Sequence, residues 1–358
     1  MRRGLWLVAV LAALSMVGAA CGSDNNKKSS SSATTVPIAC DPGTISGAGS
    51  TFVQNIAQQW IKDFQAKCSG ATVTYQGVGS GAGIQQFTAG TIDFGGTDVP
   101  MSATEEQAAV AKGGQVTTVP WSGGGIAVEY NLSGVSDLKL SPETVAGIFA
   151  GKIKTWNDKA IKDDNSGANL PSTGIQVVHR SDGSGTTAAF TGYLTAVAPT
   201  VWTAGAAKDV PWPTGQGAKG SDGVTAQVKQ TAGAIGYAEV SFAKGSQLGI
   251  ASIKNASGAF VQPDAKNVTA ALAEAPSPPD LKIKPNYKPT GADSYPISTP
   301  TFVLAFSRQK DPAKGKLLKD FLSYAVGPGQ SAAEGLYYAP LPSDLQTKAK
   351  SAVDAIQT

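Results

Sequence analysis

Hydrophobic positions along this chain follow two spacings. Short runs of β-branched and aromatic residues predict strands, and between them apolar residues recur at the three- and four-residue spacing of a helix face. The clearest helix covers residues 52–67, with apolar positions at Val53, Ile56, Ala57, Trp60, Ile61 and Phe64. The predicted strands are residues 71–78, 125–131, 175–180, 234–240 and 301–307. This alternation predicts an α/β protein.

Two more helices are predicted from their first residues. Ser141 and Asp311 each stand directly before a proline, so a capping side chain precedes a proline in the first helical turn. Residues 255–298 are instead rich in Pro, Lys, Asn and Ala, and we expect loops to dominate there.

The N-terminus has the pattern of an export signal. Arg2 and Arg3 precede an apolar stretch at residues 5–14 that is too short to span a bilayer comfortably, so residues 1–20 are expected to be a cleaved signal peptide. The segment that ends at Cys21 resembles a bacterial lipobox, although Gly18 stands where that pattern prefers Leu or Val. The resemblance implies a lipid on Cys21 and anchoring to the cell membrane; plain secretory cleavage is the alternative.

A tether and a cysteine pair follow the leader. Residues 21–40 are rich in Ser and Thr and too polar to pack, so we expect a flexible tether. Export permits a disulfide, and with Cys21 set aside Cys40 and Cys68 remain as one pair. Two free buried thiols are the alternative.

Composition excludes several functions. With 358 residues, of which 41% are hydrophobic, the chain supports a packed core and about two domains. Lys+Arg 29 against Asp+Glu 26 leaves little excess charge, and no basic block is interleaved with aromatics, so no nucleic-acid partner is expected. His179 is the one histidine of the sequence, which limits zinc and Ser/His/Asp chemistry; we expect no metal and no cofactor.

Glycine-flanked hydroxyl residues form three clusters, at residues 47–52, 77–83 and 181–187, each just before a helical pattern. The unpaired N–H groups of a helix N-terminus bind anions, glycine allows close approach, and Ser or Thr adds a donor. No cluster continues as a nucleotide P-loop or matches G-x-G-x-x-G in the dinucleotide-binding context. Taken singly, each cluster has an ordinary N-cap as its alternative reading.

Three charged residues sharpen this prediction. Arg180 can donate two hydrogen bonds to one oxyanion, and Asp182 can hold its guanidinium in place. The alternative is that Arg180 and Asp182 form an exposed surface ion pair. Asp98 suits an anion that carries a proton, because an ionised carboxylate accepts from the O–H of phosphate and repels sulfate, which has none. The alternatives are that Asp98 caps a turn before Pro100, or that Asp93 is the functional acid.

These segments together resemble the phosphate-binding proteins that supply the phosphate-specific ABC importer. The matching motifs, in order, are GAGSTF at 47–52, YQGVGSGAG at 75–83, DFGGTD at 93–98, GKIKTWND at 151–158 and VVHRSDGSGTT at 177–187. The resemblance implies a two-lobed periplasmic-binding-protein fold of type II, in which each lobe has a central β-sheet flanked by helices and the ligand lies in the cleft between the lobes.

The resemblance also implies a ligand set. The residues expected to contact phosphate are Thr51, Phe52 through its backbone N–H, Ser80, Asp98, Arg180, Ser184, Gly185 and Thr186. Asp182 would orient Arg180. Two residues depart from the family pattern, Ser50 and His179, and His179 would add at most a weak pH dependence.

We expect lobe I to comprise residues 41–118 with 295–358, and lobe II residues 119–294. The predicted function is high-affinity extracytoplasmic phosphate binding by a monomer that docks on membrane permease subunits and has no enzymatic activity. The alternatives are a binding protein for another, sulfate-like oxyanion, a secreted phosphatase or esterase with Ser80 or Ser184 as nucleophile, and a surface lipoprotein without a ligand.

Overall fold

The computed structural model describes residues 38–358, so the predicted signal peptide, the lipidation of Cys21 and nearly all of the tether lie outside the described residues. Cys40 and Cys68 form the predicted disulfide. It ties the start of the described chain to the end of the first helix, α1 (Gln54–Lys67). Within residues 38–358, no helix combines the length and the apolar character needed to cross a bilayer.

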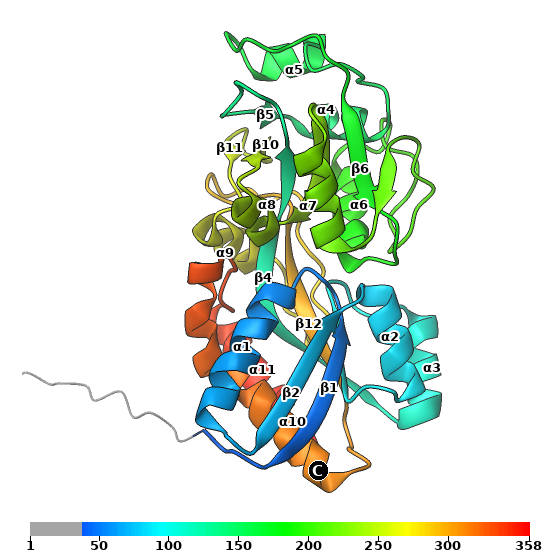
Figure 1. Ribbon diagram of the computed structural model, residues 1–358, viewed down its shortest axis with the longest axis vertical. Helices are drawn as coiled ribbons and strands as arrows, with labels where there is room; N and C mark the ends of the chain where they lie inside the picture. The colour runs from blue at the N-terminus through cyan, green and yellow to red at the C-terminus, as the bar shows by residue number, and fades with distance from the viewer. Residues whose placement is uncertain (1–37) are drawn as a thin grey trace, which may run out of the picture. The chain divides into compact units, whose positions relative to one another are not determined.

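We use lobe I and lobe II as names for the two predicted residue ranges, and lobe I contains a sheet whose first three strands are parallel (Figure 1). The central strand β1 (Gly43–Gly49) pairs along its whole length with β2 (Ala71–Gly77) and, near its C-terminal end, with β3 (Phe94–Thr97). The long strand β12 (Ser298–Phe306) runs antiparallel beside β3. The helices of this lobe are α1, α2 (Ser80–Ala89), α3 (Ala103–Gly113), α10 (Pro312–Val326) and α11 (Ser343–Asp354).

Lobe II continues the same strand order, which reads β2-β1-β3-β12-β4-β8-β6-β7. Its strands are β8 (Ala234–Glu239), β6 (Gln176–Arg180) and β7 (Gln216–Ala218), with β9 (Gly249–Ile250) paired to β4. A small separate sheet contains β5 (Lys139–Leu140), β10 (Ser252–Lys254) and β11 (Phe260–Val261). Its helices are α4 (Pro142–Phe149), α5 (Lys159–Asp164), α6 (Gly185–Val197), α7 (Gly220–Gln230) and α8 (Val240–Ser246).

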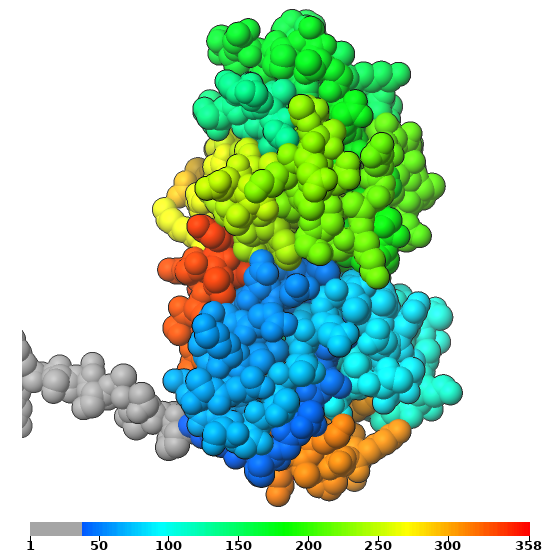
Figure 2. Space-filling view, in the orientation of Figure 1, coloured from blue at the N-terminus to red at the C-terminus, as the bar shows by residue number. Residues whose placement is uncertain are grey.

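The strand β4 (Val116–Tyr130) joins the two lobes. Its first part pairs with β12 up to Gly125, and its last part, from Ile126, pairs with β8. Gly124 lies at this change of partner, where a Cβ atom would stand 2.7 Å from Cζ of Phe52. Lobe I and lobe II lie in direct contact across this junction, as the blue-to-cyan and green atoms of Figure 2 show.

Most predicted elements are confirmed, with local differences. Every apolar position of the predicted helix 52–67 is buried, and Asp311 caps α10 by accepting from the N–H groups of Ala313 and Lys314. Ser141 precedes α4 but its side chain makes no capping bond; its hydroxyl instead contacts Oγ1 of Thr144 at 2.7 Å. The expected loop region also contains α9 (Ala265–Ala273), whose buried face packs against β4 and β12.

Substituting Gly124→Ala is expected to lower the free energy of unfolding by about 1–3 kcal/mol, because the new methyl group would overlap the fully buried ring of Phe52. Urea denaturation measures the change. The control is Gly245→Ala in α8, where a Cβ meets nothing within 4 Å and alanine is expected to add about 0.5–1 kcal/mol. A Gly124→Ala variant as stable as the parent would show that the ring is not confined there.

Candidate functional site: a junction of helix N-termini

The three hydroxyl clusters all lie at helix N-termini, as the sequence predicts. The cluster at 47–52 includes the end of β1 and precedes α1. The cluster at 77–83 contains Ser80, the first residue of α2, and the cluster at 181–187 includes the start of α6. Ser184 is the N-cap of α6 and its Oγ accepts from the N–H of Thr187 at 3.0 Å. Three partial positive charges therefore meet at the junction of the lobes.

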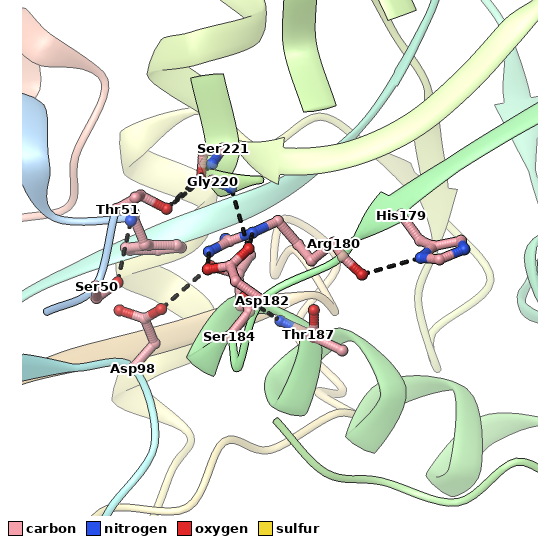
Figure 3. A network of polar contacts seen from close by, with 12 residues as sticks. Ser50, Thr51, Asp98, His179, Arg180, Asp182, Ser184, Thr187, Gly220 and Ser221 are labelled. Atoms are coloured by element: carbon pink, nitrogen blue, oxygen red, sulfur yellow. Dashed lines mark hydrogen bonds and ion pairs between the residues drawn. The ribbon is translucent and has the colours of Figure 1, made fainter. Parts of the chain in front are cut away.

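Hydrogen bonds across the junction bring the clusters together. Thr51 Oγ1 lies 2.9 Å from Ser221 Oγ and accepts from the Ser221 N–H at 3.1 Å. The N–H of Gly81 donates to the carbonyl of Gly183 at 2.8 Å. Thr186 Oγ1 in α6 donates to Asp98 Oδ2 at 3.1 Å, and Figure 3 shows Asp98 together with the contact between Thr51 and Ser221. The two lobes are therefore closed onto one another at the site.

Arg180 and Asp182 form a buried bidentate pair. The guanidinium donates through Nε to Oδ1 at 2.7 Å and through Nη2 to Oδ2 at 2.5 Å, and the side chains are 2% and 14% exposed. The alternative of an exposed surface pair is therefore wrong. Partial burial alone would raise the pKa of Asp182, but Arg180 and the N–H of Gly220 hold it below its ordinary value. The pair fixes the guanidinium, whose remaining N–H groups stay available to a ligand.

Asp98 is a buried carboxyl surrounded by hydroxyl donors. Thr301 donates to Oδ1 at 3.0 Å and Thr186 to Oδ2 at 3.1 Å. Burial raises the pKa of Asp98, and hydrogen bonds from Ser50, Thr301 and Thr186 together with the charge of Arg180 offset part of that rise. A carboxyl held in this way is a strong hydrogen-bond acceptor when it is ionised.

The hydrogen bonds of this region argue against both alternatives for Asp98. The turn before Pro100 is bonded by Thr97, whose Oγ1 donates to the carbonyl of Val99 at 2.7 Å, and the Asp98 side chain takes no part in it. Asp93 is engaged elsewhere, where its carboxylate accepts from the Ser46 N–H and from Lys314 Nζ.

Ser80 has the most informative side chain of the site. Its Oγ is completely buried and, among the described residues, has no hydrogen-bond partner. A Cβ added to Gly185 would lie 2.5 Å from this oxygen and 2.9 Å from Asp98 Oδ2, so both oxygens border the same point beside the start of α6. A buried hydroxyl without a partner costs about 1–3 kcal/mol, which a hydrogen-bonding ligand beside Ser80 would recover.

Sequence reasoning missed a fourth helix N-terminus at this junction. Gly220 and Ser221 begin α7; the first donates its N–H to Asp182 Oδ1 at 3.0 Å and the second contacts Thr51. The sequence does contain a signal for this helix start, because the segment from Gly220 to Gly223 has the same glycine-flanked hydroxyl pattern as the other clusters. Its residues hold Asp182 and Thr51 in place.

His179 stands beside the site without entering it. Its ring stacks on Trp212 with centroids 4.7 Å apart, and Nδ1 lies 2.9 Å from the carbonyl of Arg180. Burial lowers its pKa, so the imidazole is neutral at pH 7. Neither Ser80 nor Ser184 is a hydrogen-bond partner of this ring among the described contacts.

The arrangement combines backbone and hydroxyl donors, one oriented cation and one acceptor carboxyl, and the side chains of Ser80, Asp98, Arg180 and Thr186 are buried. Such a site suits a small oxyanion that bears at least one proton, since Asp98 needs a donor and the other groups need acceptors.

Comparison with known proteins first identifies the superfamily to which the chain belongs. Residues 29–328 match the family model described as a PBP superfamily domain, and this agrees with the mixed α/β fold and its central sheet. A solved structure of a high-affinity periplasmic phosphate-binding protein, PfluDING, bound with phosphate superposes with a TM-score of 0.71 at 26% identity, over 86% of this chain and 93% of that one. The predicted α/β periplasmic-binding-protein fold is confirmed.

Relatives of higher sequence identity than this structure identify the family within the superfamily. The phosphate-binding protein PstS of Pasteurella multocida (strain Pm70) is 42% identical over 322 residues, 88% of this chain and 91% of the relative. The phosphate-binding protein PstS 3 of Mycobacterium tuberculosis (strain ATCC 25618 / H37Rv) is 38% identical over 360 residues, 98% of this chain and 97% of the relative. The chain belongs to the PstS family of phosphate-binding proteins.

Two further carboxyls, those of Glu129 and Glu239, are completely buried. Burial raises the pKa of each to about 8, and hydrogen bonds from Thr225 to Glu129 and from Ser241 to Glu239 offset only part of the effect. Both groups are therefore protonated at neutral pH in the folded protein, whereas in the unfolded chain they ionise near the ordinary pKa of 4.5.

We expect the free energy of unfolding to fall as the pH rises from 5 to 8, because between these two pKa values the folded state binds more protons than the unfolded state. Glu129→Gln keeps an oxygen acceptor for Thr225 and removes one of the two titrations. The variant should therefore lose less stability over this interval, by on the order of 3 kcal/mol. Urea denaturation at several pH values measures the slopes, and parallel curves for parent and variant would contradict the assignment.

Proposed function

We propose that this protein binds inorganic phosphate with high affinity between its lobes and delivers it to the permease of an ABC importer. The observation that supports this most strongly is the buried, unpartnered Oγ of Ser80, which borders the same point as Asp98 at the N-terminus of α6. PstS relatives and a phosphate-bound structural neighbour support the same ligand.

The proposed ligand set draws on both lobes. Lobe I supplies Thr51, the N–H of Phe52, Ser80 and Asp98, and lobe II supplies Arg180, Ser184, Gly185 and Thr186. In this structure the Phe52 N–H donates to Ser50 Oγ at 3.0 Å, a bond that the anion would replace or share. Asp182 orients Arg180. Closure is favoured when the anion is bound, because it then contacts groups that are far apart in an open form.

Asp98 makes the site selective for a protonated anion. Phosphate near neutral pH carries at least one O–H, which donates to the ionised carboxylate in a charge-assisted bond. Sulfate carries no proton and would place its oxygens against those of Asp98 in a dry cleft, so it is excluded by repulsion. A sulfate-like ligand is therefore the weaker candidate.

We infer no catalytic role for the cleft. Ser184 Oγ is used as an N-cap, Ser80 has no base within hydrogen-bond reach among residues 38–358, and the imidazole of His179 faces Trp212. The relatives reported above are named as binding proteins.

The proposal extends to location and partners. We propose that the protein acts as a monomer outside the cytoplasm, that Cys21 carries the lipid that anchors it to the cell membrane, and that residues 41–118 with 295–358 and residues 119–294 are the two lobes. The similarity to a periplasmic phosphate-binding protein and to the PstS relatives supports export and transport; permease docking follows from the family.

Calorimetric titration of the anion-free protein with phosphate and then sulfate at pH 7 tests the proposed function. We expect one phosphate per chain, bound at submicromolar concentration, and no heat from sulfate. Equal binding of both anions would refute the role of Asp98, and binding of neither would refute the function.

Two substitutions in the cleft test the ligand set. Arg180→Ala is expected to weaken phosphate binding by at least about 100-fold, because it removes charged hydrogen bonds and leaves Asp182 buried without its partner. Asp98→Asn is expected to weaken phosphate binding by about tenfold and to allow sulfate to bind, because the amide is neutral and can donate. Titration calorimetry with both anions measures each change.

The matched control is Asp93→Asn, which removes an acid that is bonded to Ser46 and Lys314 instead of facing the cleft. The variant should bind phosphate with the affinity of the parent and show no heat of sulfate binding. If Asp98→Asn behaved in the same way as Asp93→Asn, the proton-accepting role would be wrong.

A further inference from the structure

Two ion pairs join helix α3 of lobe I to lobe II. Lys208 Nζ lies 2.7 Å and 2.6 Å from the two carboxylate oxygens of Glu105, and Lys282 Nζ lies 2.8 Å and 2.7 Å from those of Glu106. Both lysines therefore contact their partner carboxylates through both oxygens. None of these side chains belongs to the proposed ligand set.

These pairs differ from the exposed ion pairs of residues 38–358. The side chains of Lys208 and Glu105 are only 18% and 28% exposed, whereas those of the Lys159–Asp163 pair within α5 are 86% and 61% exposed. Lys282 and Glu106 are 28% and 29% exposed. Partial burial reduces screening by water, so these pairs are worth more than an exposed pair.

The first pair is attached to ligand-contacting segments on both sides. The backbone carbonyl of Lys208 accepts from the N–H of Ser184 at 2.8 Å, just before α6. Glu105 lies in the first turn of α3, and its carboxylate also accepts from the N–H of Ser102 at 2.8 Å. Asp98 precedes this capping box by only a few residues along the chain. The pair thus links the segment of Asp98 to the segment of Ser184 without contacting the anion.

The second pair is anchored on lobe II in a similar way. Leu281 and Ile283, on either side of Lys282, are buried, and Tyr287 further along packs edge-on against Tyr193 of α6. The backbone that carries Lys282 is therefore fixed against lobe II, and separation of the lobes would pull its ammonium away from Glu106.

Building on the proposed function, we propose that Glu105–Lys208 and Glu106–Lys282 form an electrostatic latch that holds the cleft closed over the bound phosphate and sets its rate of release. The latch forms when the lobes meet and breaks when they part. Its four side chains are positioning residues: they act on the lifetime of the closed complex and leave the contacts to the anion unchanged.

A double-mutant cycle in phosphate-release kinetics tests the latch. Lys208→Met keeps the length of the side chain, and Glu105→Gln keeps an oxygen for the Ser102 N–H while removing the charge. Each single variant is expected to release phosphate about fivefold faster than the parent. The double variant should be no faster than about fivefold, because both changes remove the same interaction. Stopped-flow transfer of phosphate to a fluorescent phosphate sensor measures the rates.

Two controls accompany the cycle: the salt dependence of phosphate release, and the removal of an ion pair that does not join the lobes. Raising the ionic strength from about 0.02 M to about 0.5 M should accelerate release from the parent and have less effect on the double variant, because salt screens the latch. Lys159→Met with Asp163→Asn removes an exposed pair within lobe II and should leave release unchanged. The thermal stability of the anion-free variants should equal that of the parent, which separates a latch from a structural role.

The outcomes distinguish the two proposals. A parent that binds no phosphate would refute the proposed function. A parent that binds phosphate, with parental release rates in Lys208→Met and Glu105→Gln, would refute the latch alone. Additive effects of the two substitutions on release would also refute it, because the side chains would then act independently.

Discussion

The structure depends on the neutralisation of a cation, Arg180, that is buried in the cleft. Its guanidinium is held by Asp182, and Asp98 adds a second carboxyl, so these three side chains offer an anion no excess of positive charge. What the cleft offers instead is a set of fixed dipoles: the N-termini of α1, α2 and α6 and the hydroxyls beside them. Dipoles that are fixed before the ligand arrives need no reorganisation, and exclusion of water strengthens them.

This constraint explains why the site is assembled between two lobes. The loops that begin α1, α2 and α6 follow the C-terminal ends of β1, β2 and β6, where open α/β sheets place their ligands. One lobe alone would leave these dipoles in water, which weakens them. Contact between the lobes, through Thr51, Gly81 and Thr186, makes the dry environment. In the proposed function, closure and anion binding therefore support each other, and the ion pairs of α3 add to the stability of the closed state.

The sequence predicted the parts of the site that depend on local pattern. The helix at 52–67 and the three hydroxyl clusters at helix starts could be read from spacing, and Asp98 could be chosen as a candidate acceptor from its chemistry. It could not decide whether the pair of Arg180 and Asp182 is exposed or buried, because burial is set by the meeting of the lobes. The partners of Glu105 and Glu106 could not be predicted for the same reason, since Lys208 and Lys282 are distant in the chain.

Strands rich in glycine were the main omission in the predicted fold. β1 and β3 contain too few β-branched residues to show a strand pattern, and the first part of β4 is interrupted by Pro120 and by the glycines at 123–125. The glycines are required by packing. A Cβ at Gly124 would overlap Phe52, and one at Gly49 would overlap the backbone of Gly96. Tertiary contacts therefore override local strand propensity where the sheet approaches the site.

A crystal structure of the phosphate complex would decide whether the proposed ligand set is right. We predict one phosphate between the lobes, with Ser80 Oγ and the N–H groups of Phe52, Gly185 and Thr186 within about 3.2 Å of its oxygens. One phosphate oxygen should lie within the same distance of an Asp98 carboxylate oxygen, as a shared proton requires. A phosphate bound elsewhere, or one that leaves Ser80 and Asp98 without contact, would refute the proposed site.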